Sequence, residues 1–304
     1  MKGLLAPSSA HSAEDLFSWI VELVGEGVFE WDEEAIRGGF LNPLRIYTRQ
    51  AARSLPVSVA SCLLEAVDED ARDHEPLLAA LILWMAGGAL AEETLFLGRS
   101  SIQREPYYLS SDIGSALTLS MTAQNMSRAF LFNHMGRADR DTRISLHHEI
   151  ARGLTAWSLG LGYESKWRGG NRGPVPEKAY LSRVRCSTLA CGLRLAVLWT
   201  SGLFRRLKSA APALLRYGDC VAVSRALDLE RKFSRCSPEH LGFSMDVGSR
   251  KGGRSSRLKI KADFWRGQAL REAARSGLDE KSIGTLKAIA GEGNIRPSLN
   301  RSRL

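Results

Sequence analysis

Two pairs of carboxylates stand out because each follows a long apolar stretch. Glu92 and Glu93 end the segment PLLAALILWMAGGALAEE, and Asp228 and Glu230 lie in RALDLERKF. Carboxylate oxygens are the ligands that hard divalent cations such as Mg²⁺ select. Residues two apart on a helix project about 200° apart, so Asp228 and Glu230 cannot both face one cavity. The alternative interpretation is that all four are solvated charges on helix surfaces.

A basic segment, SRKGGRSSRLKIK, spans residues 249–261 and offers groups that could bind an anion. Gly252 and Gly253 would let backbone amides approach a phosphate group. The first half of the segment has no apolar periodicity, so it is predicted to be a loop. A solvated loop without a ligand is the simplest alternative. The cations of the basic segment are Arg250, Lys251, Arg254, Arg257, Lys259 and Lys261.

The net charge of +9 is unevenly distributed. Residues 1–100 carry 7 basic and 16 acidic side chains, whereas residues 231–275 carry 12 basic and 4 acidic ones. Such a basic region can serve a nucleic acid, an anionic membrane or a phosphorylated small molecule. Nucleic-acid binding is the weaker interpretation, because the basic segment lacks interleaved aromatic residues and no zinc-ligand spacing accompanies it.

The composition is that of a globular protein kept in a reducing compartment. The chain has 304 residues, 44% of them hydrophobic, and five cysteines with no C-x-x-C pair, so a disulfide framework is not expected. The N-terminus has no secretory-signal pattern. The longest uncharged run, residues 76–91, is shorter than the ~20 residues of a membrane helix and favours a buried core helix. We expect a cytoplasmic protein.

The elements that must position these charged groups are predicted to be helices. Ile113, Leu117, Met121 and Gln124 recur at helical spacing along one stripe. Thr142 or Ser145 is a candidate start for the following helix. Proline is favoured in the first turn of a helix, and the sequence has such prolines at three predicted starts. These prolines are Pro76, Pro176 and Pro212, and the second is predicted to open one continuous helix through Trp199.

No window alternates apolar and polar residues, so no substantial sheet is expected. The sequence predicts an all-α protein, a single large helical bundle over residues 13–292, with a flexible N-terminus (1–12) and a flexible basic tail (293–304). The helices near residues 76–96, 178–202 and 212–233 are predicted to pack together at the centre.

Several segments also match, in order and spacing, a known family pattern. The helix beginning at Pro176 carries Glu177, Tyr180, Leu181 and Thr188, and the segment RYGDCVAVSRALDLERKF follows about thirty residues later. Upstream, AGGALAEETLFLGRSSIQREP carries an acidic pair followed by arginine and proline, and IRGGFLNPLR carries two glycines and a proline. These segments resemble the polyprenyl synthetase family, the trans-isoprenyl diphosphate synthases.

The sequence departs from the family pattern mainly at its chemical positions. Glu92, Glu93 and Phe96 stand where the family has the three aspartates of its first motif, and Leu229 and Glu230 stand at the pair of the second. Ser187 replaces a lysine. In ARGLTAWSLG, only Gly153 remains of a further motif, and Arg104 and Pro106 correspond to the arginine–proline end of the first.

The resemblance implies the isoprenoid synthase fold and a chemistry in which Mg²⁺ neutralises a leaving diphosphate. It implies that Glu92, Glu93, Asp228 and Glu230 are the metal ligands. The implied diphosphate-binding groups are Arg104 and the six cations of the basic segment.

Three functions remain open. One is a divergent prenyltransferase or terpene synthase that binds a prenyl diphosphate. Another is a non-catalytic subunit of a heteromeric prenyl diphosphate synthase. The last is a helical regulator that binds nucleic acid. The resemblance implies a homodimer, or a heterodimer with a related active synthase.

Overall fold

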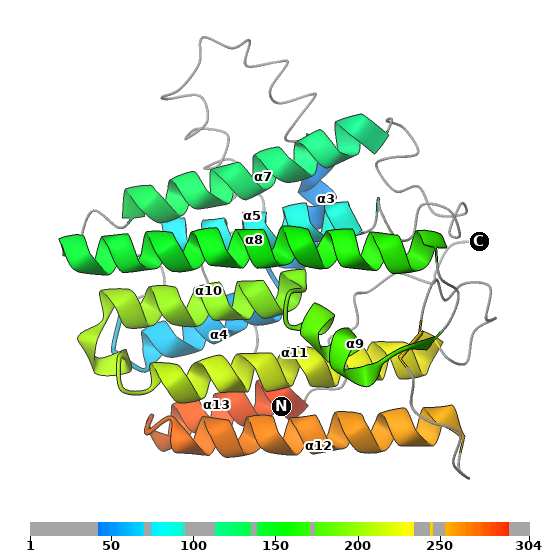
Figure 1. The fold of residues 1–304 in the computed structure, drawn as a ribbon. Helices are drawn as coiled ribbons and strands as arrows, with labels where there is room; N and C mark the ends of the chain where they lie inside the picture. The colour runs from blue at the N-terminus through cyan, green and yellow to red at the C-terminus, as the bar shows by residue number, and fades with distance from the viewer. Residues whose placement is uncertain are drawn as a thin grey trace.

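The protein is a bundle of long, roughly aligned α-helices (Figure 1). The computed structural model describes residues 42–69, 74–92, 94, 113–134, 139–170, 174–233, 244–245 and 253–291. The prediction of an all-α fold is confirmed. The strands among these residues are β1 (Pro174–Val175) and β2 (Ser244–Met245), which pair in parallel over two residues each.

The helices follow one another through the chain with short connections where both neighbours are described. Their bounds are α3 Asn42–Ala51, α4 Leu55–Glu65, α5 Glu75–Glu92, α7 Ile113–His134, α8 Arg140–Gly170, α9 Glu177–Val184, α10 Thr188–Leu203, the 3₁₀ turn η5 Arg205–Leu207, α11 Ala211–Phe233, α12 Arg254–Arg275 and α13 Glu280–Gly291.

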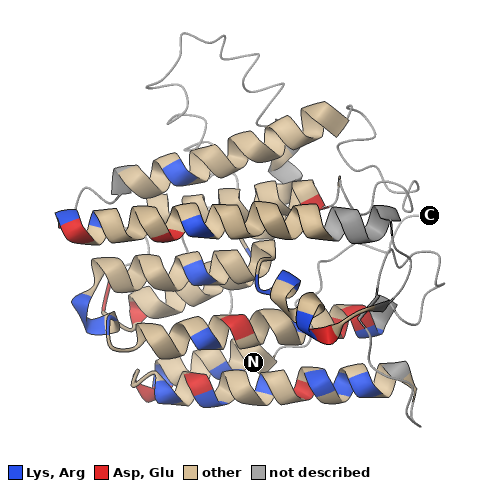
Figure 2. Ribbon diagram, viewed as in Figure 1, with Lys and Arg blue, Asp and Glu red and all other residues tan. Residues whose placement is uncertain are grey.

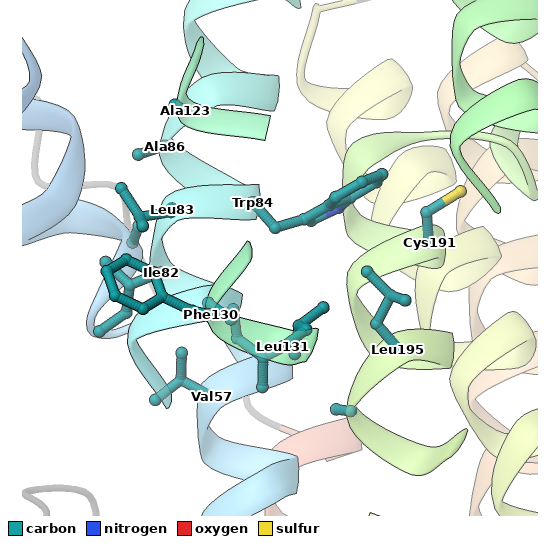
Figure 3. Packing of buried hydrophobic residues seen from close by; sticks show 14 of the residues in the cluster. Val57, Ile82, Leu83, Trp84, Ala86, Ala123, Phe130, Leu131, Cys191 and Leu195 are labelled. Atoms are coloured by element: carbon teal, nitrogen blue, oxygen red, sulfur yellow. The ribbon is translucent and has the colours of Figure 1, made fainter. Parts of the chain in front are cut away.

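The centre of the bundle is formed by α5, α10 and α11. Helix α10 packs against both α5 and α11, as predicted, and α7 and α3 also pack on α5. Because α5 is covered on several sides, it is apolar around most of its circumference. Trp84 of α5 points towards Cys191 and Leu195 of α10, and it is completely enclosed (Figure 3). The Cys191 thiol donates to the Gly153 carbonyl at 3.7 Å.

A second apolar cluster joins α4, α10, α11, α12 and α13. Tyr217 of α11 is fully buried in it and donates its hydroxyl to the Leu286 carbonyl of α13 at 2.8 Å. On the same side, the Cys62 thiol of α4 donates to the Ser282 carbonyl at 3.6 Å. These contacts attach the C-terminal helices to the central layer.

Helix α7 follows its predicted stripe only in part, since Gln124 of that stripe is buried and other members are exposed. Ile113 and Met121, predicted to line an apolar stripe, are 59% and 63% exposed. The buried face donates three side-chain hydrogen bonds to successive carbonyls of α5 (2.6–2.8 Å). The pairs are Ser120 with Gly87, Gln124 with Trp84, and Ser127 with Ala80. Polar side chains occupy this face because the backbones of α5 and α7 lie very close together. A Cβ on Gly87 would lie 2.9 Å from the Ser120 carbonyl oxygen.

Two helix starts also differ from the predictions. Helix α8 begins at Arg140, because Asp139 accepts hydrogen bonds from the Thr142 amide (2.8 Å) and hydroxyl (2.7 Å) and so caps the helix. The predicted single helix after Pro176 is two helices, α9 and α10, bent by 50°. Ser187 caps the second by accepting from the Ala190 amide.

Within the described ranges, each helix taken alone is too short or too polar to cross a lipid bilayer, while α9 and α10 taken together pass on length and composition. The predicted flexible segments 1–12 and 293–304 lie outside the described residues.

Candidate functional site at the α9 end of the bundle

Helix α9 contacts the helices that carry the described acidic positions, α5 and α11, and the helix that carries the described part of the basic segment, α12. We call this region the α9 end and define it as Glu92 together with residues 177–185, 225–232 and 254–266. Figure 1 shows α9 at the same end as the C-terminal end of α11 and the first turns of α12. Three contacts connect α9 to its neighbours: Arg183 with Glu92 of α5 (3.8 Å), the Tyr180 hydroxyl with the Ala226 carbonyl of α11 (3.5 Å), and Glu177 with Lys261 of α12 (2.6 Å).

Glu92 is held at the N-terminus of α10. One of its carboxylate oxygens accepts from the Thr188 amide (3.2 Å) and the Thr188 hydroxyl (2.8 Å). The same oxygen lies 3.8 Å from the Arg183 guanidinium, whose side chain is only 6% exposed. The free amides and the dipole of a helix N-terminus favour a negative charge. The carboxylate is therefore stabilised by two hydrogen bonds, one cation and one helix end.

Thr188 connects this carboxylate to the aromatic core. Its hydroxyl accepts from the Trp157 indole (3.0 Å), and its carbonyl accepts from the Trp84 indole (3.1 Å). The two indole rings are 5.7 Å apart. Gly88 makes room for this arrangement, since any Cβ there would overlap the Thr188 side chain. The sequence did not predict a role for either tryptophan or for Gly88. The one sequence feature that pointed to this close packing is the Gly87–Gly88 pair inside an otherwise bulky apolar helix.

Asp228 is paired with two arginines. Its carboxylate lies 2.6 Å from Arg266 of α12 and 3.5 Å from Arg231 on its own helix, and its side chain is 14% exposed. Arg266 is forked, because its other terminal nitrogen lies 2.5 Å from Asp263. Glu230 is buried on the same turn of α11. Sequence reasoning gave no sign that Arg266, 38 residues away, would be the partner of Asp228.

The basic segment is largely helical. Helix α12 begins at Arg254, so the loop predicted for the first half of the segment is wrong at the end of that half. A turn of α12 must bury Leu258 against the core, and this fixes the sides on which the neighbouring cations lie. Lys259 is exposed and Arg257 is half-buried, whereas Lys261 is bound to Glu177. The predicted site residues Glu93, Arg104, Arg250 and Lys251, and the side chain of Arg254, lie outside the described part of the chain.

The described carboxylates do not fit the magnesium site that the family resemblance implied. In the part of the chain that the structure describes, no three His, Cys, Asp or Glu side chains come together as a metal site would require. Glu92 and Asp228 are in contact with cations and hydrogen-bond donors instead. A metal ion would have to displace them.

The α9 end is strongly basic despite its carboxylates. Its segments contain eleven Lys and Arg residues against five Asp and Glu residues, a net charge of +6. Figure 2 shows the two signs interleaved over α9, the end of α11 and the start of α12, while the middle of the bundle carries few charges. What this arrangement can do chemically is attract an anion and offer it several donors.

Comparison with known proteins identifies relatives by structure rather than by sequence. No protein-family model matches the chain, and no curated protein matches it in sequence. Solved structures match it along nearly the whole chain. The geranylgeranyl pyrophosphate synthetase of the archaeon Geoglobus acetivorans is 15% identical, with a TM-score of 0.67 over 91% of this chain and 95% of that one.

Two bacterial structures match to a similar extent. An FPP/GFPP synthase from Zymomonas mobilis is 16% identical, with a TM-score of 0.65 over 92% of this chain and 96% of that chain. A geranyltransferase from Helicobacter pylori, complexed with magnesium and isoprenyl diphosphate, is 9% identical, with a TM-score of 0.63 over 92% of this chain and 97% of that one. The chain thus has the all-α isoprenoid synthase fold, the fold of these prenyl diphosphate synthases.

Proposed function

We propose that this protein binds a prenyl diphosphate, with the diphosphate at the α9 end. The observation that carries the proposal is the match of more than 90% of the chain to prenyl diphosphate synthases, one of them holding an isoprenyl diphosphate. Fold alone does not determine function. The proposal therefore also depends on the chemistry of this end of the bundle.

The charge at the α9 end supports a ligand with several negative charges. A net charge of +6 in so few turns of helix produces a field that attracts anions. Guanidinium groups match phosphate oxygens in geometry as well as in charge, and Arg257 and Arg266 lie half-buried on α12 at this end.

Two roles are compatible with this binding. As a prenyltransferase or terpene synthase, the protein would ionise the carbon–oxygen bond of the bound diphosphate. As a non-catalytic subunit, it would bind the ligand or a partner synthase without reacting. The second role agrees with one observation: two of the three described acidic positions, Glu92 and Asp228, have internal partners.

The proposal is tested by calorimetric titration with geranylgeranyl diphosphate, with geranylgeraniol as the ligand that lacks the diphosphate. We expect binding of the diphosphate and much weaker binding of the alcohol. Lys261→Gln removes a cation of the α9 end and should weaken binding about two- to fivefold. Lys281→Gln is the matched control, because Lys281 also pairs with a glutamate, Glu65, but lies outside the α9 end.

Equal affinity for the diphosphate and the alcohol would overturn the proposal. Incubation with isopentenyl diphosphate, followed by product chromatography, then separates the two roles. A longer prenyl diphosphate product indicates an active synthase. Binding without product, together with stimulation of a co-purified aspartate-bearing synthase, indicates a subunit.

A further inference from the structure

At the α9 end, arginine side chains already neutralise the carboxylates that a metal ion would otherwise neutralise. Arg183 is almost fully buried and lies against Glu92. Arg266 spans Asp228 and Asp263 with its two terminal nitrogens, at 2.6 and 2.5 Å. Each acidic position therefore has a guanidinium in place within the folded chain. A divalent cation entering beside either one would meet a positive charge at contact distance.

The total charge leads to the same conclusion. A site built from carboxylates alone is negative and cannot accept a diphosphate until metal ions reverse its sign. The α9 end already has a net charge of +6 with its carboxylates ionised. A diphosphate is therefore attracted to it directly. Arg266 needs only exchange a carboxylate oxygen of Asp228 for a phosphate oxygen, which is an exchange between similar partners.

We propose that the α9 end binds a diphosphate without a divalent metal, with arginines supplying the neutralising charge. This inference depends on the proposed function, since it concerns the same site. It makes Asp228 the internal partner of Arg266 and Arg231, which a phosphate oxygen replaces, rather than a metal ligand. It also makes Arg266, whose side chain is 25% exposed, the cation that contacts the diphosphate, while the buried Arg183 neutralises Glu92.

The first test needs no variant. Geranylgeranyl diphosphate is titrated into the wild-type protein in a buffer with EDTA and in one with magnesium. The dissociation constants should agree within about threefold. Binding that requires magnesium would overturn this inference and leave the proposed function intact. Absence of binding in both buffers would overturn both.

The second test compares affinities, because the two roles considered for Asp228 predict opposite changes in affinity for the diphosphate. Asp228→Asn keeps the shape of the side chain but removes a negative charge from beside Arg266. If arginines bind the diphosphate, affinity in EDTA should rise about two- to fivefold. If Asp228 ligates a metal, the variant should lose affinity in the magnesium buffer, and that loss would contradict the inference.

Asp219→Asn is the matched control. Asp219 lies on the same helix, about 13 Å along its axis from Asp228, and pairs with Arg194 at 3.3 Å. Its replacement should leave the affinity unchanged in both buffers. Thermal melting of each variant verifies folding, and the wild-type comparison stands even if Asp228→Asn is destabilised.

Discussion

At the scale of single residues, Thr188 of α10 connects three side chains from two other helices, α5 and α8. Its hydroxyl donates to Glu92 and accepts from Trp157, and its carbonyl accepts from Trp84. The family resemblance predicted the threonine itself. Its partners could not be predicted, because they come from α5 and α8, between 31 and 104 residues away.

Replacement of Thr188 by valine should therefore be costly. The variant keeps the volume but leaves the buried Trp157 indole donor without its partner and removes the hydroxyl that donates to the half-buried Glu92 carboxylate, so the free energy of unfolding should fall by about 1–3 kcal/mol. Urea denaturation measures this change. Thr155→Val is the control, since Thr155 is exposed and donates only within α8, and it should change the free energy by about 0.5 kcal/mol or less. Equal effects in the two variants would refute the role given to Thr188.

Asp279 provides a pH-dependent prediction at the same scale. It caps α13 by accepting from the Ser282 amide (2.9 Å) and hydroxyl (2.7 Å), and these hydrogen bonds lower the pKa of its carboxyl. Because the folded-state pKa is depressed, the cap stabilises the protein above the unfolded-state pKa of about 3.9. This stabilisation is lost as the pH falls through the folded-state pKa.

Asp279→Ala should lower the free energy of unfolding by about 1 kcal/mol at neutral pH. The difference from wild type should shrink as the pH falls below about 4. Asp279→Asn keeps an acceptor at the cap and should remove most of the pH dependence with a smaller loss of stability. Urea denaturation over a pH series measures all three proteins. A constant difference between wild type and the alanine variant down to low pH would exclude the charged cap as the cause.

At the scale of elements, periodicity predicted where helices lie better than which face they bury. The stripe that includes Ile113 and Met121 was read as the buried side of α7, because apolar spacing is the usual signal. The stripe holds only for Gln124, because the close approach of α7 to α5 buries Gln124 together with Ser120 and Ser127. No one-dimensional pattern reveals their hydrogen bonds to the α5 carbonyls. The break between α9 and α10 was predictable in principle, from Ser187 as a helix cap.

The close contacts of α5 predict the effect of filling its glycines. Gly88→Ala would place a methyl group inside the Thr188 side chain, so the free energy of unfolding should fall by about 1–3 kcal/mol or more. Gly162→Ala is the control, because its Cβ would meet no atom within 4 Å and the site is on the exposed side of α8. That variant should gain about 0.5–1 kcal/mol. Thermal or urea denaturation compares them, and a neutral Gly88→Ala would show that α5 and α10 are less closely packed.

At the scale of the whole molecule, the helical bundle and its central layer followed from the sequence. Apolar runs such as residues 76–91 are too long to be anything but buried helices, and three of them must pack together. For the α9 end, the sequence predicted an excess of basic residues but not their contacts. Which cation meets which carboxylate depends on how α9 and α12 are placed against α5 and α11, and that placement joins residues tens of positions apart.

The outer surface of α7 and α8 favours a dimer. Phe132 of α7 stacks on His147 of α8, with ring centroids 3.6 Å apart, and both helices present large apolar side chains to the solvent. Exposed apolar patches commonly mark interfaces. The side chains are Ile113, Met121, Ile144, Leu159 and Tyr163.

We expect the purified protein to be a dimer by size-exclusion chromatography with light scattering. Met121→Lys should shift it towards the monomer, whereas Ile260→Lys should not. Ile260 is as exposed as Met121, at 68% against 63%, but it lies on α12. A strict monomer, alone and in the presence of a related synthase, would rule out this interface.

The buried cysteine thiols can report when the hydrophobic core opens. Burial raises the pKa of Cys62 and Cys191 to about 12, and that of Cys220 to about 11. Since only the thiolate is alkylated, these cysteines should react at neutral pH only when the packing around them opens. Cys191 belongs to the cluster around Trp84 and Cys62 to the cluster around Tyr217. Pulse alkylation with mass spectrometry would thus time the opening of each half of the interior separately, and equal rates would mean that the two halves open as one cooperative unit.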